Sequence, residues 1–318
     1  MKKGVFRHPW VGPLVALILV YGLFAILRPE TFASPMTVMN MARQTVVVGI
    51  TAIGMTFIII SGGIDLSVGS SIALTTVVVA LTLRAGASAI TASLVGVGVA
   101  AFAGTVVGSL VVGLRVMPFI ITLGMMSILR GVARGLAKQQ TVSARSSGLD
   151  DLLSMLPPNK RWMLFPPGVW VMIAVAIAAS ALLKYTRFGR HVFAIGSNEQ
   201  TARLCGVRVP LTRIVVYALA GALTGLAGVM EFGTLTLGDP TDSFGRELDV
   251  IAAVVIGGAS LTGGEGSILG SLIGAFLMTV IATGATFMGL ADWVQQILTG
   301  VIIIVAVAAD RLRHRATA

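Results

Sequence analysis

Four carboxylates stand inside or beside long apolar runs of this 318-residue chain: Asp65, Glu231, Asp249 and Glu265. A charge at the depth of a lipid bilayer is costly, and it usually faces a water-filled cavity or a partner group. These acids are therefore the first candidates for a polar route or an ion site. Glu231 and Asp249, with the acids between them, also indicate a solvated acidic patch that a soluble partner can recognise.

Motifs for enzyme chemistry are absent from the sequence. It has no Gly-x-x-x-x-Gly-Lys-Ser/Thr loop to bind a nucleoside triphosphate, no His-Glu-x-x-His zinc motif and no nucleophile elbow. Cys205 is the only cysteine, which excludes an internal disulfide and a Cys-x-x-Cys metal site. We therefore expect no catalytic residue, no metal and no cofactor on this chain.

The segment 61–71, SGGIDLSVGSS, interrupts an apolar run with glycines, serines and one acid. Such breaks are tolerated at membrane depth only where they are buried or line water. The segment predicts that Ser61, Asp65, Ser67 and Ser70 line a polar path. The alternative is a tight turn in which Asp65 caps a helix, and the two are compatible. The frame Gly-Gly-x-x-Leu-Ser/Thr recurs at 257–262, which hints at a second, equivalent break.

The composition requires a membrane. Hydrophobic residues make up 56% of the chain and charged residues only 11%, against about 25% charged in a soluble domain. Glycine is abundant, at 38 residues, as in packed transmembrane helices. The apolar runs are long and continuous, so they predict an all-α, polytopic membrane protein. The net charge of +10 is spread over loops and termini, which argues against a nucleic-acid partner.

Segments of about 20 apolar residues can cross the bilayer as helices. On that measure the chain has about ten transmembrane helices. The expected spans are 11–27, 44–62, 67–83, 89–114, 117–136, 166–183, 213–231, 248–262, 266–288 and 293–309.

The loops define the organisation of residues 1–318, which we take as a single transmembrane domain. The loop at about 138–165 separates two five-span halves, about 11–137 and 166–309. Basic residues cluster at both termini and in the loop 184–213. Because Lys and Arg favour the cytoplasmic side, we expect both termini and this loop in the cytoplasm.

The loop 184–213 contains a short predicted helix at 197–206. Ser197 and Gln200 form a capping-box pattern at its start, and Gly206 stands where a glycine would end it. A helix of about two turns is not stable alone. It must therefore dock against its own protein or a partner. Cys205 on this helix is most simply a small packing residue.

Four segments carry a resemblance to a known family. They are 55–70, MTFIIISGGIDLSVGS; 194–207, AIGSNEQTARLCGV; 118–124, PFIITLG; and 255–264, VIGGASLTGG. With these motifs, which occur along the chain in the same order as in the family, the sequence resembles the ribose-type permeases of bacterial ABC sugar importers, from about residue 40 to residue 312. The resemblance implies the fold of a type II ABC importer permease.

The resemblance also implies partners and a location. Such permeases are inner-membrane subunits that pair as homo- or heterodimers. They work with a separate ABC ATPase subunit and a periplasmic sugar-binding protein. An ATPase on another chain would explain the missing nucleotide-binding loop. The transported solute would be a monosaccharide such as a pentose or hexose, moved by alternating access.

The family's ATPase-coupling helix corresponds here to residues 197–206. The resemblance makes Asn198, Glu199, Ala202, Arg203 and Leu204 the residues that couple to the ATPase. Glu199 and Arg203 would provide polar contacts, while Ala202 and Leu204 would pack.

Other functions remain open from the sequence. The solute could be a nucleoside, a furanose similar to autoinducer-2 or a branched-chain amino acid. A distant alternative is an ion-coupled secondary carrier, in which Asp65 or Glu265 would bind the ion.

Overall fold

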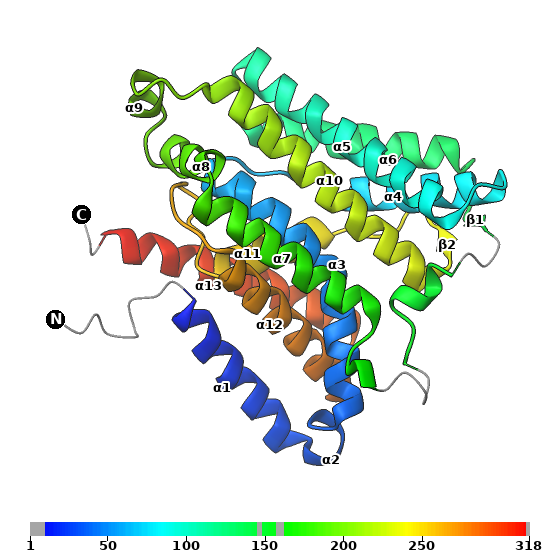
Figure 1. The fold of residues 1–318 in the computed structure, drawn as a ribbon. Coiled ribbons are helices and arrows are strands. Elements are labelled where there is room, and N and C mark those ends of the chain that lie inside the picture. The colour runs from blue at the N-terminus through cyan, green and yellow to red at the C-terminus, as the bar shows by residue number, and fades with distance from the viewer. Residues whose placement is uncertain (1–9, 145–147, 157–161, 316–318) are drawn as a thin grey trace.

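The computed structural model describes residues 10–144, 148–156 and 162–315 and confirms an all-α fold (Figure 1). The helices of the first part are α1 (Val11–Leu27), α2 (Pro29–Phe32), α3 (Pro35–Ile60), α4 (Val68–Arg84), α5 (Ala89–Leu114) and α6 (Pro118–Leu136). After the 3₁₀ helix η2 (Asp150–Leu152) follow α7 (Pro167–Tyr185), α8 (Arg187–Ser197), α9 (Glu199–Leu204), α10 (Val209–Leu235), α11 (Arg246–Ile256), α12 (Ile268–Phe287) and α13 (Asp292–Arg315).

Nine of the ten expected spans coincide with apolar helices in the described part of the chain. Six of these helices, α3, α5, α6, α7, α10 and α12, are long and apolar enough to cross a membrane. Three shorter apolar helices are Val11–Leu27, Val68–Arg84 and Trp293–Val305. Large apolar side chains such as Ile26, Ile90 and Ile304 are at least 70% exposed, as expected for surfaces that face lipid.

The span expected at 248–262 is not one continuous helix. Helix α11 ends at Ile256, and a glycine-rich loop leads from Gly257 to α12. With 11 residues, α11 is only about 16 Å long, too short to cross a bilayer core of about 30 Å. The glycines that continue the apolar run in the sequence end the helix in the structure.

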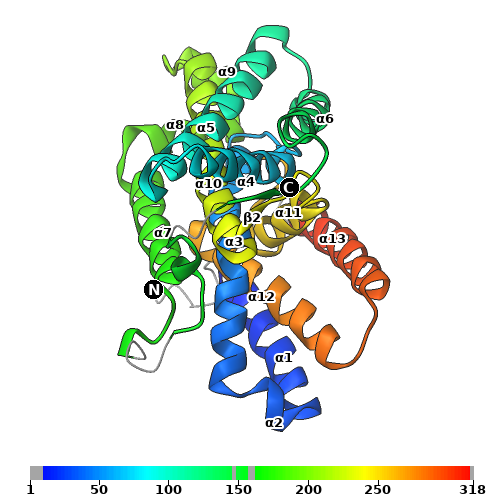
Figure 2. The same ribbon diagram turned by 90° about the vertical axis from the view of Figure 1, so that its right-hand side faces the viewer.

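Helix α3 is the centre of the molecule, and every residue from Thr45 to Ile60 is buried. It contacts α10 and α7, and also α11 and α12 from the C-terminal part of the chain (Figure 2). It begins earlier than the expected residue 44, because the Ser34 side chain accepts a hydrogen bond from the Thr37 amide and Pro35 occupies the first turn.

Helix α10 packs against α3, α4 and α5, so it joins the two halves of the chain. Its crossing with α5 is made by glycines: a methyl group on Gly104 would collide with the Tyr217 carbonyl, and one on Gly221 with the Ala100 carbonyl. Small residues let helix backbones approach closely in membranes. This crossing fixes the direction of α10 relative to the first half.

The first turn of α1, the end of α13 and α9 lie toward one side of the molecule (Figure 1). We call this side the α9 end. The strands β1 (Val142–Ser143) and β2 (Leu237–Gly238) pair antiparallel on the opposite side, which we call the β end. Helix α3 runs from the β end to the α9 end, and α12 returns from the α9 end to the β end.

Candidate functional site

Helices α8 and α9 form a compact unit at the α9 end. The Asn198 side chain caps α9 by accepting a hydrogen bond from the Thr201 amide at 2.9 Å. The expected cap, Ser197, is instead the last residue of α8, so the N-cap of α9 lies one residue later than predicted. Gly206 has a φ of +81° and follows the helix, as predicted for a glycine at this end.

Glu199 connects α9 to the N-terminal part of α10. One carboxylate oxygen accepts from Arg203 at 2.6 Å and the other from Arg213 at 2.6 Å. Partial burial acts to raise the pKa of the Glu199 carboxyl, but hydrogen bonds and charges from the two arginines outweigh it, so this pKa lies below its ordinary value. The role of Glu199 within the isolated chain is therefore to position α9.

The other predicted coupling residues divide between the inside and the surface. Ala202 is buried against Ile195 and Val209 of its own chain, so its side chain is not available to a partner in this conformation. Leu204 is 89% exposed, and the Arg203 side chain is 57% exposed. The outward surface of α9 includes Gln200, Thr201, Arg203 and Leu204, with the Cys205 thiol, also exposed, directly after them.

A cleft of about 410 Å³ lies beneath α9, between the turn after α5 and the start of α10. Its charged lining is Arg115, Glu199, Arg203 and Arg213, and Gly62 reaches it from the break after α3. We call it the α9 cleft. It places the charged residues of α9 next to the glycine-rich break of the central helix.

The two glycine-rich segments that share a sequence frame meet at the α9 end. The Gly264 amide donates to the Ile60 carbonyl at 2.9 Å. A methyl group on Gly196, near the end of α8, would collide with the same carbonyl, and one on Gly263 would lie 3.1 Å from the Gly62 Cα. We call this contact of Ile60, Gly62, Gly196, Gly263 and Gly264 the glycine junction. It connects α8, and through it α9, to the end of α3.

The predicted path residues Ser61, Asp65, Ser67 and Ser70 lie in the closed interior. Each is at most 5% exposed, and none lines the α9 cleft or the cavity described below. Asp65 Oδ1 accepts from the Ser67 amide at 2.8 Å and from its hydroxyl at 2.6 Å. Asp65 therefore closes a tight turn before α4 and does not cap the helix itself.

Tyr217 of α10 supports this turn and was not singled out by the sequence. Its hydroxyl donates to the Ile64 carbonyl at 3.4 Å, and its side chain is 1% exposed. The missing side chain of Gly63 makes room for the ring, because a Cβ there would lie 2.7 Å from the tyrosine oxygen. The only signal in the sequence is a lone tyrosine within an apolar helix.

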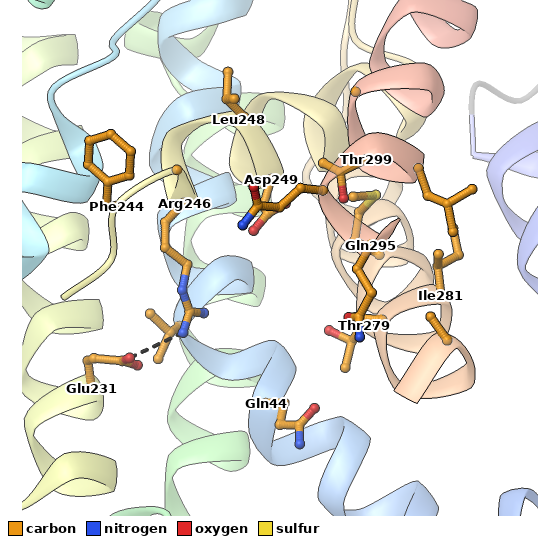
Figure 3. A pocket seen from close by; sticks show the side chains of 18 of the residues that line it. Gln44, Glu231, Phe244, Arg246, Leu248, Asp249, Thr279, Ile281, Gln295 and Thr299 are labelled. Atoms are coloured by element: carbon orange, nitrogen blue, oxygen red, sulfur yellow. Dashed lines mark hydrogen bonds and ion pairs between the residues drawn. The ribbon is translucent and has the colours of Figure 1, made fainter. Parts of the chain in front are cut away.

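A second cavity, of about 1020 Å³, opens between α3, α10, α11, α12 and α13 (Figure 3). We call it the interhelical cavity. It lies toward the β end, because Gln44 and Val47 line it from the first half of α3 and Glu231 and Thr234 from the last turns of α10. Gln295 and Thr299 complete the wall from α13.

An ion pair spans this cavity between Arg246 of α11 and Glu231 of α10, at 3.2 Å (Figure 3). Glu231 is 5% exposed and Glu247 7%. The expectation of a solvated acidic patch is therefore wrong for these two acids. Residues 236–245 fold back into the protein after α10. The acids that the sequence suggested for a solvated loop therefore lie among helices.

The described residues contain no group of three or more His, Cys, Asp or Glu side chains that could hold a metal ion. What the geometry offers is a polar cavity, a helical surface set by ion pairs and a backbone junction.

Comparison with known proteins identifies the family of this chain. Residues 37–307 match the family described as "Branched-chain amino acid transport system / permease component". The ribose import permease protein of Escherichia coli is 39% identical over 312 residues, which cover 97% of each chain. The ribose import permease protein of Bacillus subtilis is 35% identical over 302 residues, 95% of this chain and 92% of the relative.

The fructose import permease protein of Rhizobium meliloti is 35% identical over 312 residues, 96% of this chain and 87% of the relative. No solved structure matches the chain. The family consists of transport permeases, which confirms that this chain is a transport subunit and not an enzyme. It is a multi-pass membrane protein that belongs to the permease family of carbohydrate ABC transporters.

Proposed function

We propose that this chain is the membrane-spanning subunit of an ATP-driven importer for a monosaccharide. The observation that carries the proposal is 39% identity to a ribose import permease over nearly the whole of both chains. The family description names branched-chain amino acids, but the similar relatives are named for ribose, fructose and galactose. We therefore place the solute among neutral sugars.

The ATPase of this importer is a separate chain that docks on α9. The sequence has no nucleotide-binding loop, so the energy of ATP must enter through a contact. Leu204 and Arg203 provide an exposed apolar and charged surface, and Asn198 and Glu199 hold that surface in place. A short helix fixed in this way is suited to transmit a push.

The α9 end faces the cytoplasm of a bacterium, and the chain lies in the inner membrane. The start of α1 and the end of α13 lie on the same side as α9, and basic residues cluster at both termini and around α9. Because Lys and Arg favour the cytoplasmic side of a membrane, both termini lie in the cytoplasm.

The break at 61–67 forms the inner end of the solute route, closed in this conformation. Ser61, Asp65, Ser67 and Ser70 are buried there, next to the glycine junction that connects α3 to α8. A push on α9 reaches the break through this junction. Opening the break exposes its hydroxyls and carboxylate to the solute, which completes alternating access.

Two further partners complete the importer. A periplasmic binding protein delivers the sugar at the β end, and a second permease subunit, identical or paralogous, forms a dimer in the lipid bilayer with this chain.

A pull-down from the native host in mild detergent tests the proposal. We expect a nucleotide-binding-loop ATPase and a periplasmic binding protein in stoichiometric amounts, and a monosaccharide eluted from that binding protein. A distinct second permease band would identify a heterodimer. If the chain is isolated alone and vesicle uptake follows an ion gradient without ATP, the protein is an ion-coupled carrier, with Asp65 or Glu265 as the ion site to test first.

The Cys205 thiol provides an independent check of the docking surface. It is the only cysteine, and it is exposed directly after α9. A maleimide should label it readily in the isolated chain and at least about tenfold more slowly in the complex, as expected for a residue at the centre of an interface. Equal labelling rates would place the ATPase elsewhere.

A further inference from the structure

The interhelical cavity lies toward the β end, away from the proposed contact with the ATPase at α9. We propose that it is the compartment that holds the solute during transport, and that it selects an uncharged, hydroxyl-rich molecule of monosaccharide size. This inference rests on the proposed transport function and assigns the solute site within it.

The position of the cavity suits a compartment on a route that is closed at one end. Its volume of about 1020 Å³ is at the upper end of the roughly 300–1,000 Å³ typical of ligand pockets, so a sugar fits together with bound water. Along α3, every residue from Val48 to Ile60 is buried, a sealed length of about 18 Å. A solute in the cavity is thus separated from the α9 end until the packing around α3 changes.

The charges of the cavity favour an uncharged solute. Its charged lining residues are two arginines, Arg43 and Arg246, and two acids, Glu231 and Asp249. The formal charges cancel, and Arg246 already pairs with Glu231 at 3.2 Å. An anion or a cation would therefore gain no compensating net charge for its loss of hydration, whereas a neutral molecule does not need one.

Several polar groups in the cavity are available for hydroxyls. Among the described residues, no hydrogen bond is made by the side chains of Gln44, Asp249 or Thr299, and the buried Arg43 Nε has no partner. A carboxylate accepts from hydroxyls, an arginine donates, and amide and hydroxyl groups do both. This combination matches a sugar, each of whose hydroxyls is at once donor and acceptor.

An aromatic ring completes the lining. Phe244 is 82% exposed although it is a large apolar residue, and it lies on the wall of the cavity in the turn before α11 (Figure 3). The face of an aromatic ring carries partial negative charge. It therefore accepts the polarised C–H groups on the apolar face of a sugar ring.

The test uses the whole transporter, purified with its co-purifying ATPase and binding protein and reconstituted in liposomes. One variant, Ala282→Trp, fills the cavity from an exposed position on α12 that lines it. Its matched control is Ala178→Trp, at an exposed position on α7 outside the cavity. A second variant, Asp249→Asn, changes one polar group without changing its shape, with Glu30→Gln on α2 as control.

Uptake of labelled ribose, fructose, galactose and leucine is measured beside ATPase stimulation by the binding protein. We expect Ala282→Trp to reduce sugar uptake by at least about tenfold, since a filled pocket excludes its ligand, while stimulated ATPase activity stays within about twofold. Asp249→Asn replaces an ionised acceptor by a neutral one, and ribose and galactose present different hydroxyls to it. The ratio of ribose to galactose uptake should therefore change by up to about tenfold, the size of the lost charge assistance. A purely structural role for Asp249 would not alter that ratio.

The outcomes separate this inference from the function on which it rests. Wild-type liposomes without ATP-dependent uptake would overturn the transport proposal itself. Normal wild-type uptake together with normal uptake and selectivity in both variants would overturn only the cavity assignment. ATP-dependent uptake of leucine but of no sugar would show that the cavity takes a zwitterion. If Ala282→Trp fails to assemble, the selectivity ratio of Asp249→Asn decides the matter.

Discussion

The two ends of α3 differ in what they place against their neighbours. At the α9 end, Ile60 meets Gly196 and Gly264 through backbone atoms, with no space for a side chain. Toward the β end, Gln44 and Val47 line a cavity of about 1020 Å³. The close backbone contact is suited to transmit displacement, whereas the cavity, which is lined by side chains, is suited to recognise a solute. Helix α3 thus connects a contact that can transmit movement with a cavity that can bind a solute.

The largest effect should come from adding one methyl group to the junction. In Gly196→Ala the new Cβ collides with the Ile60 carbonyl, so we expect a loss of stability of about 2–3 kcal/mol from overpacking and loss of uptake. The control is Gly124→Ala on α6, where nothing lies within 4 Å of the added atom. Thermal unfolding in detergent measures both variants, and equal midpoints would show that the junction is not tight.

Separating α9 from α10 should affect coupling more than folding. The double variant Glu199→Ala, Arg203→Ala removes the ion pairs that position α9. Because such surface pairs contribute at most about 1 kcal/mol each, the midpoint of unfolding should hardly move. Stimulation of the ATPase should fall by about tenfold, as for central residues of an interface.

The matched control for this double variant is Arg28→Ala, Glu30→Ala, an exposed charged pair near α2. Normal stimulation in the α9 variant would remove α9 from the coupling surface.

A smaller effect is expected at the turn before α4. Asp65→Asn with Ser67→Ala loses the hydroxyl bond of 2.6 Å and weakens the turn by about 1 kcal/mol. If this turn is the inner end of the route, uptake should fall several-fold while assembly with the ATPase is retained. The control, Ser93→Ala on α5, removes a hydroxyl bonded only to the Ala89 carbonyl. Unchanged uptake in the first variant would exclude these residues from the route.

The smallest effect is a pH dependence of α9. Because the pKa of Glu199 is lower in the folded chain than its ordinary value, the ion pairs contribute stability above the ordinary carboxyl pKa of about 4.3. That contribution is lost as the pH falls through the lowered value. Hydrogen exchange of residues 199–205 should therefore increase at low pH beyond the intrinsic trend. Glu199→Gln should abolish the dependence, and an identical profile in that variant would contradict it.

The apolar spans were predictable because membrane burial acts on windows of about 20 residues, which composition reveals. The end of helix α11 was not predicted in this way. Gly257 and Gly258 count as neutral in a hydropathy window, yet they end the helix. The cap of α9 was predicted one residue too early because Ser197 and Asn198 are both good caps. Only the end of α8 decides between them.

The two functional regions differ in how far the sequence revealed them. Residues around α9 are local, so the motif at 194–207 located them. The interhelical cavity takes its walls from five helices, and Gln44 and Gln295 are ordinary polar residues in the sequence. Glu231 was expected in a solvated acidic patch, because its partner, Arg246, lies 15 residues away across a returning segment. Contacts between distant segments leave no periodic signal, so they could not be predicted.

The glycine junction also bears on how a transporter of this kind changes its cargo over evolutionary time. Because it is made of backbone atoms and missing side chains, it carries no information about the solute. Mutations among the residues that line the interhelical cavity can accumulate without altering it. A duplicated copy of the gene would therefore keep this contact and would need to change only the lining of the cavity. Such divergence fits relatives named for ribose, fructose and galactose that are each similar to this chain over nearly its whole length.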